Sequence, residues 1–326
     1  MNSNHYSSLV QGVFKQDRLS IGRLISKVEN HEPGIFPILA KLFSKTGRAL
    51  RVGITGFPGS GKSTIINQLA KELTKKKKKV AVVLMDPSSP FSGGALLGDR
   101  IRMREIQMNP GVFIRSMATR GKMGGLNLAA RYASDILDAA GYDFILLETV
   151  GVGQLEIDIA TSSDLTIAVM TPDSGDEVQA MKAGLMEIAD IFVVNKMDRD
   201  KGQIYFSRIK KGLQWHSEAR GHKSIEVLPM AALYGKGIDP LTQKLIEFSV
   251  KKRQGKLNGE REKIRAEEDI KSCVEEIFME QIYNEPQVEK KIREILPKVR
   301  SRKSSPYDAA EEVLKMGLKN LIKKNK

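Results

Sequence analysis

The chain has 326 residues, 41% hydrophobic and 28% charged, a composition typical of a globular protein with one large domain or two. Its formal net charge is +14, but aromatic residues make up only 6% and no nucleic-acid-binding module is visible, so we do not expect a nucleic-acid partner. The polar start Met1–Ser8, the lack of any apolar run near the roughly 18 residues of a membrane span, and a lone cysteine, Cys273, predict a cytoplasmic protein without disulfides or membrane association.

Helical periodicity marks the first part of the chain. Within residues 14–46, near-helical spacing is shown by Leu19, Ile21, Leu24, Ile25 and Val28. Pro33-Gly34 interrupts this pattern, and a second apolar segment follows over Ile35–Phe43. We therefore predict an N-terminal helical extension over residues 1–48.

From Arg51 the pattern changes to short β-branched runs separated by segments of helical length. The seven runs are VGIT, VAVVLM, VFIR, FILLE, LTIAVM, IFVVN and IEVL. Alternation of such runs with helices favours an α/β fold with a mostly parallel, doubly wound sheet. We place this domain at residues 49–252.

The strand pattern ends near Ser249. Residues 251–268 are heavily charged, and mixed amphipathic stretches then continue to Lys326. Ser305-Pro306 has the composition of a helix start. We predict that residues 253–326 form a C-terminal helical region.

The first strand run leads into a glycine-rich loop, GFPGSGKST, which precedes the helix-like run IINQLAKEL. The loop fits the pattern GxxxxGK[ST], in which backbone N–H groups surround phosphate oxygens at a helix N-terminus. Lys62 is expected to reach the β and γ phosphates, and Ser63 to offer its hydroxyl to Mg²⁺. The predicted nucleotide-binding residues of this loop are Gly56, Pro58, Gly59, Ser60, Gly61, Lys62, Ser63 and Thr64.

A base-reading motif follows the run IFVV. Asn195-Lys196-Met197-Asp198 fits NKxD, in which Asp198 accepts hydrogen bonds from guanine N1–H and N2–H₂, a pair of donors that adenine lacks. We expect Asn195 to hold this loop against the phosphate loop, and the Lys196 stem to cover one face of the base. After the last strand, backbone N–H groups in the segment Pro229–Leu233, with Ala231 and Ala232 as the predicted nucleotide-binding residues, can meet guanine O6, although an ordinary strand-to-helix loop explains that segment equally well.

Two further strand runs end in carboxylates. Asp86 follows VAVVLM and opens a loop rich in Gly, Ser and Pro that includes Asp99. Both carboxylates can bind Mg²⁺ through its waters or orient the attacking water, although Asp86 can also start a turn and Asp99 can cap a helix. Glu148 ends the run FILLE and is expected to anchor the water shell of Mg²⁺.

Glu148 also opens an ExxG stretch, a variant of the DxxG loop that senses hydrolysis. Gly151 can give its N–H to the γ-phosphate, and Gln154 can orient water. The predicted catalytic residues are therefore Lys62, Asp86, Asp99, Glu148 and Gln154. Residues 172–182, after LTIAVM, form either another ligand-responsive loop or a helix start capped at Asp173 or Ser174.

Together these motifs resemble the methylmalonyl-CoA mutase-associated GTPases of the MeaB and ArgK type. The resemblance rests on GFPGSGKST, DPSSPFSGGALLGDRIRM, ETVGVGQ and NKMD in this order, and it extends to SMATRGKMGG and SPYDAAEEVL. It implies a GTPase, using GTP, GDP and Mg²⁺, that gates adenosylcobalamin loading and protects a cobalamin-dependent acyl-CoA mutase, often as a homodimer through its C-terminal helices.

The resemblance also implies roles for individual residues. Ser63, Asp86, Asp99 and Glu148 would serve the magnesium site. The loop around Gln179 and Lys182 would be a third switch that couples the GTP state to the partner. One departure from the family is Ala231, where a serine is usual, so side-chain bracing of the guanine loop is lost.

Three alternatives stay open. An ATP-using kinase or transport accessory of the LAO/AO type belongs to the same family tradition, but NKMD argues against adenine. A metal-delivery GTPase would need soft ligands, whereas the chain has four histidines, one cysteine and no CxxC or histidine cluster. A basic nucleic-acid-binding GTPase would bind in a manner that weakens steeply with salt.

Overall fold

The computed structural model describes residues 3–32, 34–86, 103–118, 125–149, 155–172, 184–220, 225–257, 259–283 and 285–324. Its backbone contacts divide the chain into two compact units, residues 1–263 and residues 264–326, and each unit is described on its own. Across these ranges, no helix combines the length and the apolar character needed to cross a membrane.

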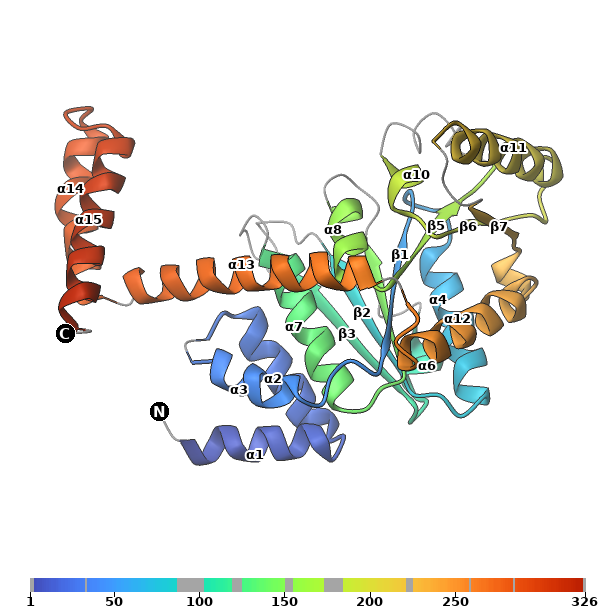
Figure 1. Ribbon diagram of the computed structural model, residues 1–326, viewed down its shortest axis with the longest axis horizontal. Coiled ribbons are helices and arrows are strands. Elements are labelled where there is room, and N and C mark those ends of the chain that lie inside the picture. The colour runs from blue at the N-terminus through green and yellow to red at the C-terminus, as the bar shows by residue number, and fades with distance from the viewer. Residues whose placement is uncertain are drawn as a thin grey trace. The chain divides into compact units, whose positions relative to one another are not determined.

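A seven-stranded sheet forms the centre of the first unit (Figure 1). Its strands are β1 (Leu50–Thr55), β2 (Val80–Asp86), β3 (Val112–Ala118), β4 (Phe144–Thr149), β5 (Leu165–Met170), β6 (Ile191–Val194) and β7 (Glu226–Pro229). The strand order is β3-β2-β4-β1-β5-β6-β7, and every neighbouring pair is parallel. All seven runs predicted from the sequence are strands, and the predicted α/β, doubly wound fold is confirmed.

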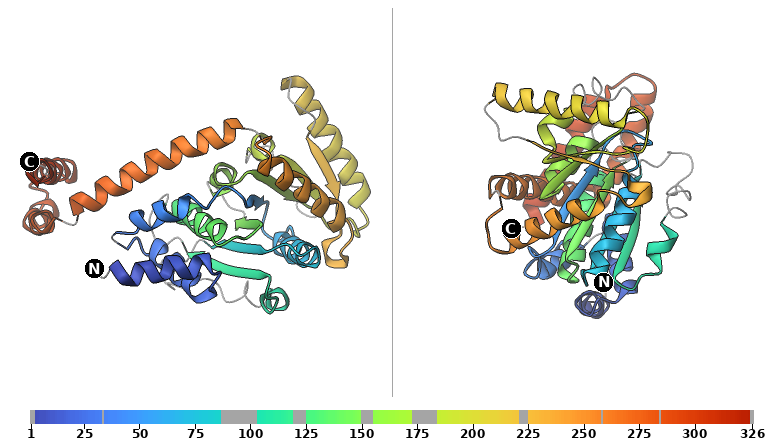
Figure 2. Two further views of the ribbon diagram at one scale, coloured as in Figure 1. Left: turned by 60° about the horizontal axis from the view of Figure 1, so that its bottom comes forward. Right: turned by 90° about the vertical axis from the view of Figure 1, so that its right-hand side faces the viewer.

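The helices connect the strands and extend the chain at both ends. They are α1 (Ser3–Phe14), α2 (Arg18–Glu29), α3 (Phe36–Phe43), α4 (Lys62–Lys75), α6 (Arg104–Gln107), α7 (Gly125–Ala139), α8 (Leu155–Ser162), α10 (Leu185–Ile188), α11 (Gly202–Arg220), η1 (Ala232–Tyr234), α12 (Ile238–Arg253), α13 (Gly259–Tyr283), α14 (Pro286–Arg300) and α15 (Pro306–Lys324). Figure 2 shows helices on both faces of the sheet.

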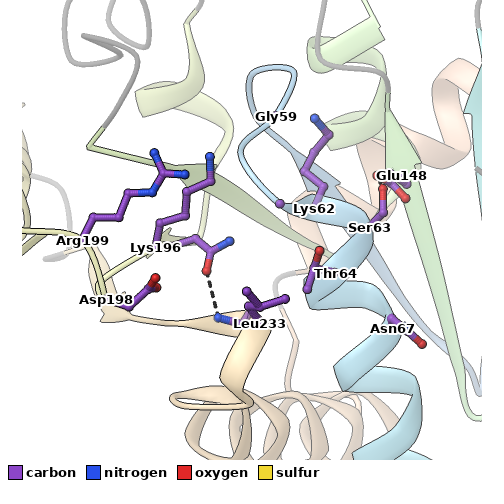
Figure 3. Close-up of a pocket in the computed structure, with 13 residues that line it drawn as sticks. Gly59, Lys62, Ser63, Thr64, Asn67, Glu148, Lys196, Asp198, Arg199 and Leu233 are labelled. Carbon is purple, nitrogen blue, oxygen red and sulfur yellow. Dashed lines mark hydrogen bonds between the residues drawn. The ribbon is translucent and has the colours of Figure 1, made fainter. Parts of the chain in front are cut away.

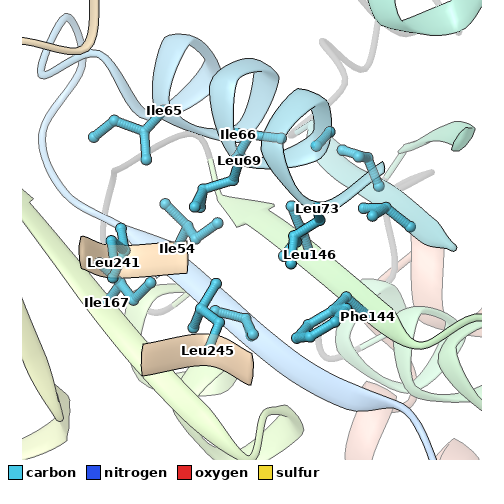
Figure 4. Close-up of a cluster of buried hydrophobic side chains, with 14 of the residues drawn as sticks. Ile54, Ile65, Ile66, Leu69, Leu73, Phe144, Leu146, Ile167, Leu241 and Leu245 are labelled. Atoms are coloured by element: carbon cyan, nitrogen blue, oxygen red, sulfur yellow. The ribbon is translucent and has the colours of Figure 1, made fainter. Parts of the chain in front are cut away.

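The pleat of β1 shows how the two faces are covered. Val52 and Ile54 belong to one buried cluster with residues of α4 and α12, shown in Figure 4. Gly53, between them, faces the opposite side, where a Cβ would lie 2.8 Å from the Ser163 hydroxyl and 3.1 Å from Ile159 of α8. A strand buried on both faces reads as a continuous apolar run, which is why the periodicity of the sequence located it.

The buried cluster fixes the position of α4. Leu69 and Leu73 of this helix are fully buried, as are Leu241 and Leu245 of α12. Burial of each such side chain is worth about 1.5–3 kcal/mol, so α4 is anchored along its length by several of them. Its N-terminus is thereby held at the carboxyl end of β1.

The N-terminal helices form a layer against β3 and α7. Arg115 of β3 makes an ion pair with Glu29 of α2 at 2.6 Å, and the Phe36 ring of α3 meets Tyr132 of α7 edge-on. Leu19, a member of the near-helical set, is in α2 but 70% exposed, because the 3.6-residue period places it on the face opposite the buried Val28. The pattern also gave no sign that α1 is a helix of its own.

In the second unit, α14 and α15 pack together and are tied by the ion pair Lys291–Glu312 at 2.5 Å. Ser305 caps α15 as the sequence predicts, because its hydroxyl accepts from the Asp308 backbone N–H at 3.1 Å. At Gly317 a Cβ would lie 3.1 Å from the Ile282 side chain, so this glycine brings α15 close to α13.

Candidate nucleotide site

One pocket of about 500 Å³ lies at the carboxyl edge of the sheet (Figure 3). This volume is in the range of small-molecule sites, and ligands of open parallel sheets bind at this edge. The pocket is lined by Gly59, Gly61, Lys62, Ser63, Thr64, Asn67, Glu148, Asn195, Lys196, Asp198, Arg199, Ala232 and Leu233.

The phosphate loop runs from the end of β1 into the first residue of α4. Gly56, Gly59 and Gly61 have φ values of 137°, 79° and 96°, a region that residues with side chains rarely adopt. Space is also limiting, because a Cβ on Gly56 would lie 2.2 Å from the Val169 carbonyl oxygen, and one on Gly61 would lie 2.3 Å from Asn195 Nδ2. Gly56 and Gly61 are therefore required on two independent grounds.

Lys62 is held at this loop. Its ammonium donates to the carbonyl oxygens of Gly56 at 2.6 Å and Phe57 at 3.1 Å. The side chain is largely buried, so the charge sits within the loop instead of in bulk water. An anion that enters the pocket meets an ammonium whose position is already fixed.

Ser63 and Glu148 form the second part of the site. The Ser63 hydroxyl donates to Glu148 Oε1 at 2.6 Å, and this glutamate is only 9% exposed. Register explains their meeting: Glu148 on β4 lies level with Ile54 of β1 and Leu84 of β2. A hydroxyl and a carboxylate are the hard oxygen ligands that Mg²⁺ prefers, so this pair fits that ion.

The predicted metal-site residue Asp86 is the last residue of β2, two positions beyond the level of Glu148. Its backbone therefore reaches the same edge of the sheet. Its side chain lies outside what the structure describes. Other predicted site residues that lie outside the described residues are Asp99, Gly151, Gln154, Gln179 and Lys182.

Asn195 joins the phosphate loop to the base loops. Its Nδ2 donates to the Ser60 carbonyl oxygen at 2.9 Å, and its Oδ1 accepts from the Ala232 backbone N–H at 3.0 Å, the dashed line in Figure 3. The side chain is buried, so both hydrogen bonds are shielded from water. One amide thus ties together three segments that are more than 30 residues apart in sequence.

The turn after β6 presents Asp198 to the pocket. Lys196 has a φ of 60°, which is uncommon for a residue other than glycine and costs about 1–3 kcal/mol. The Met197 backbone N–H donates to the Met230 carbonyl oxygen at 3.0 Å, which fixes the turn to the loop after β7. Asp198 itself is exposed, so its carboxylate is open to a ligand.

The other predicted residues have supporting positions. Gly56 and Ser60 do not line the pocket, but their carbonyl oxygens bind Lys62 and Asn195. Pro58 and Ala231 also lie outside the lining, and the Ala231 backbone N–H donates to the Lys236 carbonyl oxygen at 3.0 Å. Because the Ala231 and Ala232 amides both have protein acceptors, their contact with guanine O6 stays a prediction that requires an exchange of partner.

Two lining residues were not predicted from the sequence, Asn67 and Arg199, whereas Leu233 belongs to the predicted guanine-loop segment Pro229–Leu233. Arg199 directly follows the NKxD motif, and Asn67 lies one helical turn after Ser63, so position next to a motif is the signal that could have found them. Figure 3 places Lys196, Asp198 and Arg199 on one side of the pocket and Ser63 and Glu148 on the other.

The fold and this constellation define a P-loop GTPase. A phosphate loop, a Ser–Glu pair beside it and an NKxD turn meet at the carboxyl edge of one parallel sheet. Comparison with known proteins gives the family: residues 21–287 match the family described as methylmalonyl Co-A mutase-associated GTPase MeaB. The chain belongs to this family and is a GTPase that hydrolyses GTP.

Relatives and solved structures agree with this assignment. The chain is 44% identical over 311 residues to a GTPase candidate of Pyrococcus abyssi, covering 94% of this chain and 95% of the relative. It is 32% identical over 300 residues to GTPase ArgK of Escherichia coli, with 89% and 90% of the two chains covered. The crystal structure of a LAO/AO transport system kinase superposes with a TM-score of 0.68 at 26% identity, covering 97% of this chain and 98% of that one.

Proposed function

We propose that this GTPase depends on Mg²⁺ and reports its nucleotide state to a cobalamin-dependent acyl-CoA mutase, gating cofactor loading and protecting the mutase. The observation that carries the nucleotide part is the Asn195 amide, which joins the phosphate loop to the base loops. Support for the mutase part comes from the family, whose name states an association with methylmalonyl-CoA mutase.

The phosphate end of the site stabilises charge. Backbone N–H groups at the start of α4 bind phosphate oxygens, and Lys62 faces the β and γ phosphates. Because Lys62 is already held by two carbonyl oxygens, little ordering is needed when charge builds up on the γ-phosphate.

The Ser63–Glu148 pair is the proposed magnesium site. The Ser63 hydroxyl can keep donating to Glu148 while its oxygen lone pair faces the metal, so the observed hydrogen bond is compatible with Mg²⁺. Asp86 and Asp99 complete the proposed set of acidic groups. The ion, when bound, would neutralise charge on the β and γ phosphate oxygens.

The nucleotide-sensing segments of this proposal are Gly151 and Gln154 after β4, and Gln179 and Lys182 after β5. Both segments begin at strands that end beside the phosphate loop, since β4 and β5 are the two neighbours of β1. The segments that follow these two strands would therefore be the first to change conformation when the γ-phosphate is lost.

We also propose that residues 253–326 hold a homodimer. Ile270, Val274 and Phe278 recur every four residues along α13 and are 66%, 61% and 38% exposed. A further apolar groove of about 450 Å³ lies between α13, α14 and α15. Apolar faces of this kind are typical of obligate interfaces.

A Val274→Asp change should yield a monomer in sedimentation velocity, whereas Glu275→Ala on the neighbouring exposed position should leave the dimer intact.

An ATP-using kinase is the second candidate, because the chain shares its fold with a LAO/AO transport system kinase. Asp198, exposed at the pocket, distinguishes the two candidates because its carboxylate pairs with guanine donors that adenine lacks. Competition of ATP and GTP for the protein decides between them.

The mutase part is tested with purified components. The protein is loaded with GDP or with a non-hydrolysable GTP analogue, and its binding to the cobalamin-dependent mutase of the same source is measured by biolayer interferometry. We expect the two nucleotide states to differ at least about tenfold in affinity, a coupling of about 1.4 kcal/mol. Equal affinities, or no binding in either state, would contradict the proposed reporting role.

A further inference from the structure

Gly202, the first residue of α11, lies directly behind the base-reading turn. Its backbone N–H donates to the Arg199 carbonyl oxygen at 2.8 Å, and the residue is buried. Its φ is outside the left-handed region, so backbone conformation does not require glycine here. Glycine at position 202 must therefore be explained by the lack of space for a side chain.

The space is limited by the backbone of Met197. A Cβ on Gly202 would lie 2.9 Å from the Met197 carbonyl oxygen, 3.0 Å from its Cα and 3.2 Å from its carbonyl carbon. The first of these contacts is under 3.0 Å, which real Cβ atoms essentially never show, and the other two are tight; all three atoms belong to the backbone, so no side chain can rotate away. A side chain at position 202 therefore requires a shift between the start of α11 and the peptide that follows Met197.

That peptide carries the base-reading carboxylate. Met197 immediately precedes Asp198, and its N–H is fixed on the other side by the Met230 carbonyl oxygen at 3.0 Å. Lys196, one residue earlier, is already in the left-handed region at a φ of 60°. Because the hydrogen bond to Met230 fixes the turn on one side, a displacement of the Met197 carbonyl group also moves the next residue, Asp198.

We propose that Gly202 is a specificity-determining positioning residue: it leaves room for the Met197 carbonyl and so keeps the Asp198 carboxylate aligned with the guanine N1–H and N2–H₂ groups. The proposal rests on the proposed reading of guanine by Asp198. It adds a residue on α11 that contacts no nucleotide and acts through the backbone of the turn.

The structure supplies a matched control on the same helix. Gly212 is exposed, and a Cβ placed on it meets nothing within 4 Å. Glycine-to-alanine changes in helices favour the helix, because alanine loses less conformational freedom on folding. A purely structural role of Gly202 as a helix residue therefore predicts that Gly202→Ala and Gly212→Ala behave alike.

The test compares the affinity of each protein for GDP and for inosine diphosphate (IDP), which lacks the exocyclic N2 amino group. We expect Gly202→Ala to lower the GDP-to-IDP affinity ratio at least about fivefold, mainly by weakening GDP, while Gly212→Ala keeps the wild-type ratio. In an Asp198→Ala background, Gly202→Ala should not change the ratio further, because both changes remove the same contact.

Several results would overturn the proposal. One is a Gly202→Ala protein with the wild-type ratio, and another is a further loss of ratio in the Asp198→Ala background. A Gly202→Ala protein that unfolds before nucleotide can be measured also contradicts it, because the strain is assigned to the turn alone. If the wild-type protein shows no preference for GDP over IDP, then the reading of guanine by Asp198 fails, which is a separate outcome.

Discussion

The two edges of the central sheet both contain buried or half-buried charges, but they use them differently. At the amino edge, Arg51 makes an ion pair with Asp135 at 2.5 Å, and Lys252 makes one with Asp164 at 2.5 Å. At the carboxyl edge, Lys62 donates to backbone oxygens of its own loop, and Asp198 is exposed to the pocket. The amino edge neutralises its charges within the protein, and the carboxyl edge presents them to a ligand.

Asp138 shows how complete the neutralisation is at the amino edge. Its carboxylate accepts from the backbone N–H groups of Gly47 at 2.7 Å, Arg48 at 3.2 Å and Ala49 at 2.9 Å, just before β1. Burial would lower the pKa of Arg51, but Asp135, Asp164 and Asp138 together raise that pKa above its ordinary value. Burial of a charged residue is therefore no sign of function by itself.

The largest effect is expected at Asp138. Asp138→Ala removes the acceptor of three backbone N–H groups and a carboxylate near Arg51, so it should lower the free energy of unfolding by about 3–5 kcal/mol. Thermal and urea unfolding measure the loss. GDP affinity of the folded fraction should stay unchanged, and a weakened affinity would mean that the two edges are coupled.

At the carboxyl edge, the corresponding change is Glu148→Ala. It should slow GTP turnover about 100-fold, because a group that orders charge at the γ-phosphate is lost, and it should weaken GDP binding far less. Single-turnover experiments measure the rate of GTP hydrolysis, and titration with GDP measures the affinity for GDP. Equal losses in turnover and in GDP affinity would show that Glu148 is not a sensor of Mg²⁺ and phosphate.

Asp198→Asn tests the base end of the same edge. The new amide can donate to the C2 carbonyl of xanthine, so affinity should fall for GTP by about tenfold or more and rise for xanthosine triphosphate. Competition binding with both nucleotides measures the exchange. A variant that keeps the GTP preference of the wild type would remove Asp198 from base recognition.

The smallest effect is expected at Asp135, the more exposed partner of Arg51. Asp135→Asn keeps a hydrogen-bond acceptor and leaves Asp138 in place, so it should cost about 1 kcal/mol. Urea unfolding of Asp135→Asn and Asp138→Ala, measured side by side, shows whether the loss in free energy of unfolding increases with the burial of the substituted carboxylate. A loss as large as that of Asp138→Ala would contradict the ranking.

Much of this architecture could be predicted because its signals are local. Parallel strands such as β1 and β4 are buried on both faces and are therefore continuous apolar runs, and the phosphate loop and NKMD turn are contiguous motifs. The same holds for the Ser305 cap, which depends on residues three apart.

What could not be predicted depends on contacts between distant segments. Asp138 meets Ala49 across 89 positions, and no motif announces this contact, whereas the contact of Asn195 with the phosphate loop across 135 positions is expected from the NKxD motif. No local pattern shows that the Ala232 amide is taken by Asn195, or that Gly202 faces the Met197 backbone.

The most direct test of the carboxyl-edge site is a crystal structure of the protein with GDP and Mn²⁺ in place of Mg²⁺, with anomalous scattering used to locate the metal. We predict a single strong peak bonded to the Ser63 hydroxyl oxygen and on the Glu148 side of the pocket, with phosphates on the Gly56–Thr64 loop and the guanine edge against Asp198. A metal away from Ser63, or a guanine that does not contact Asp198, would contradict the account.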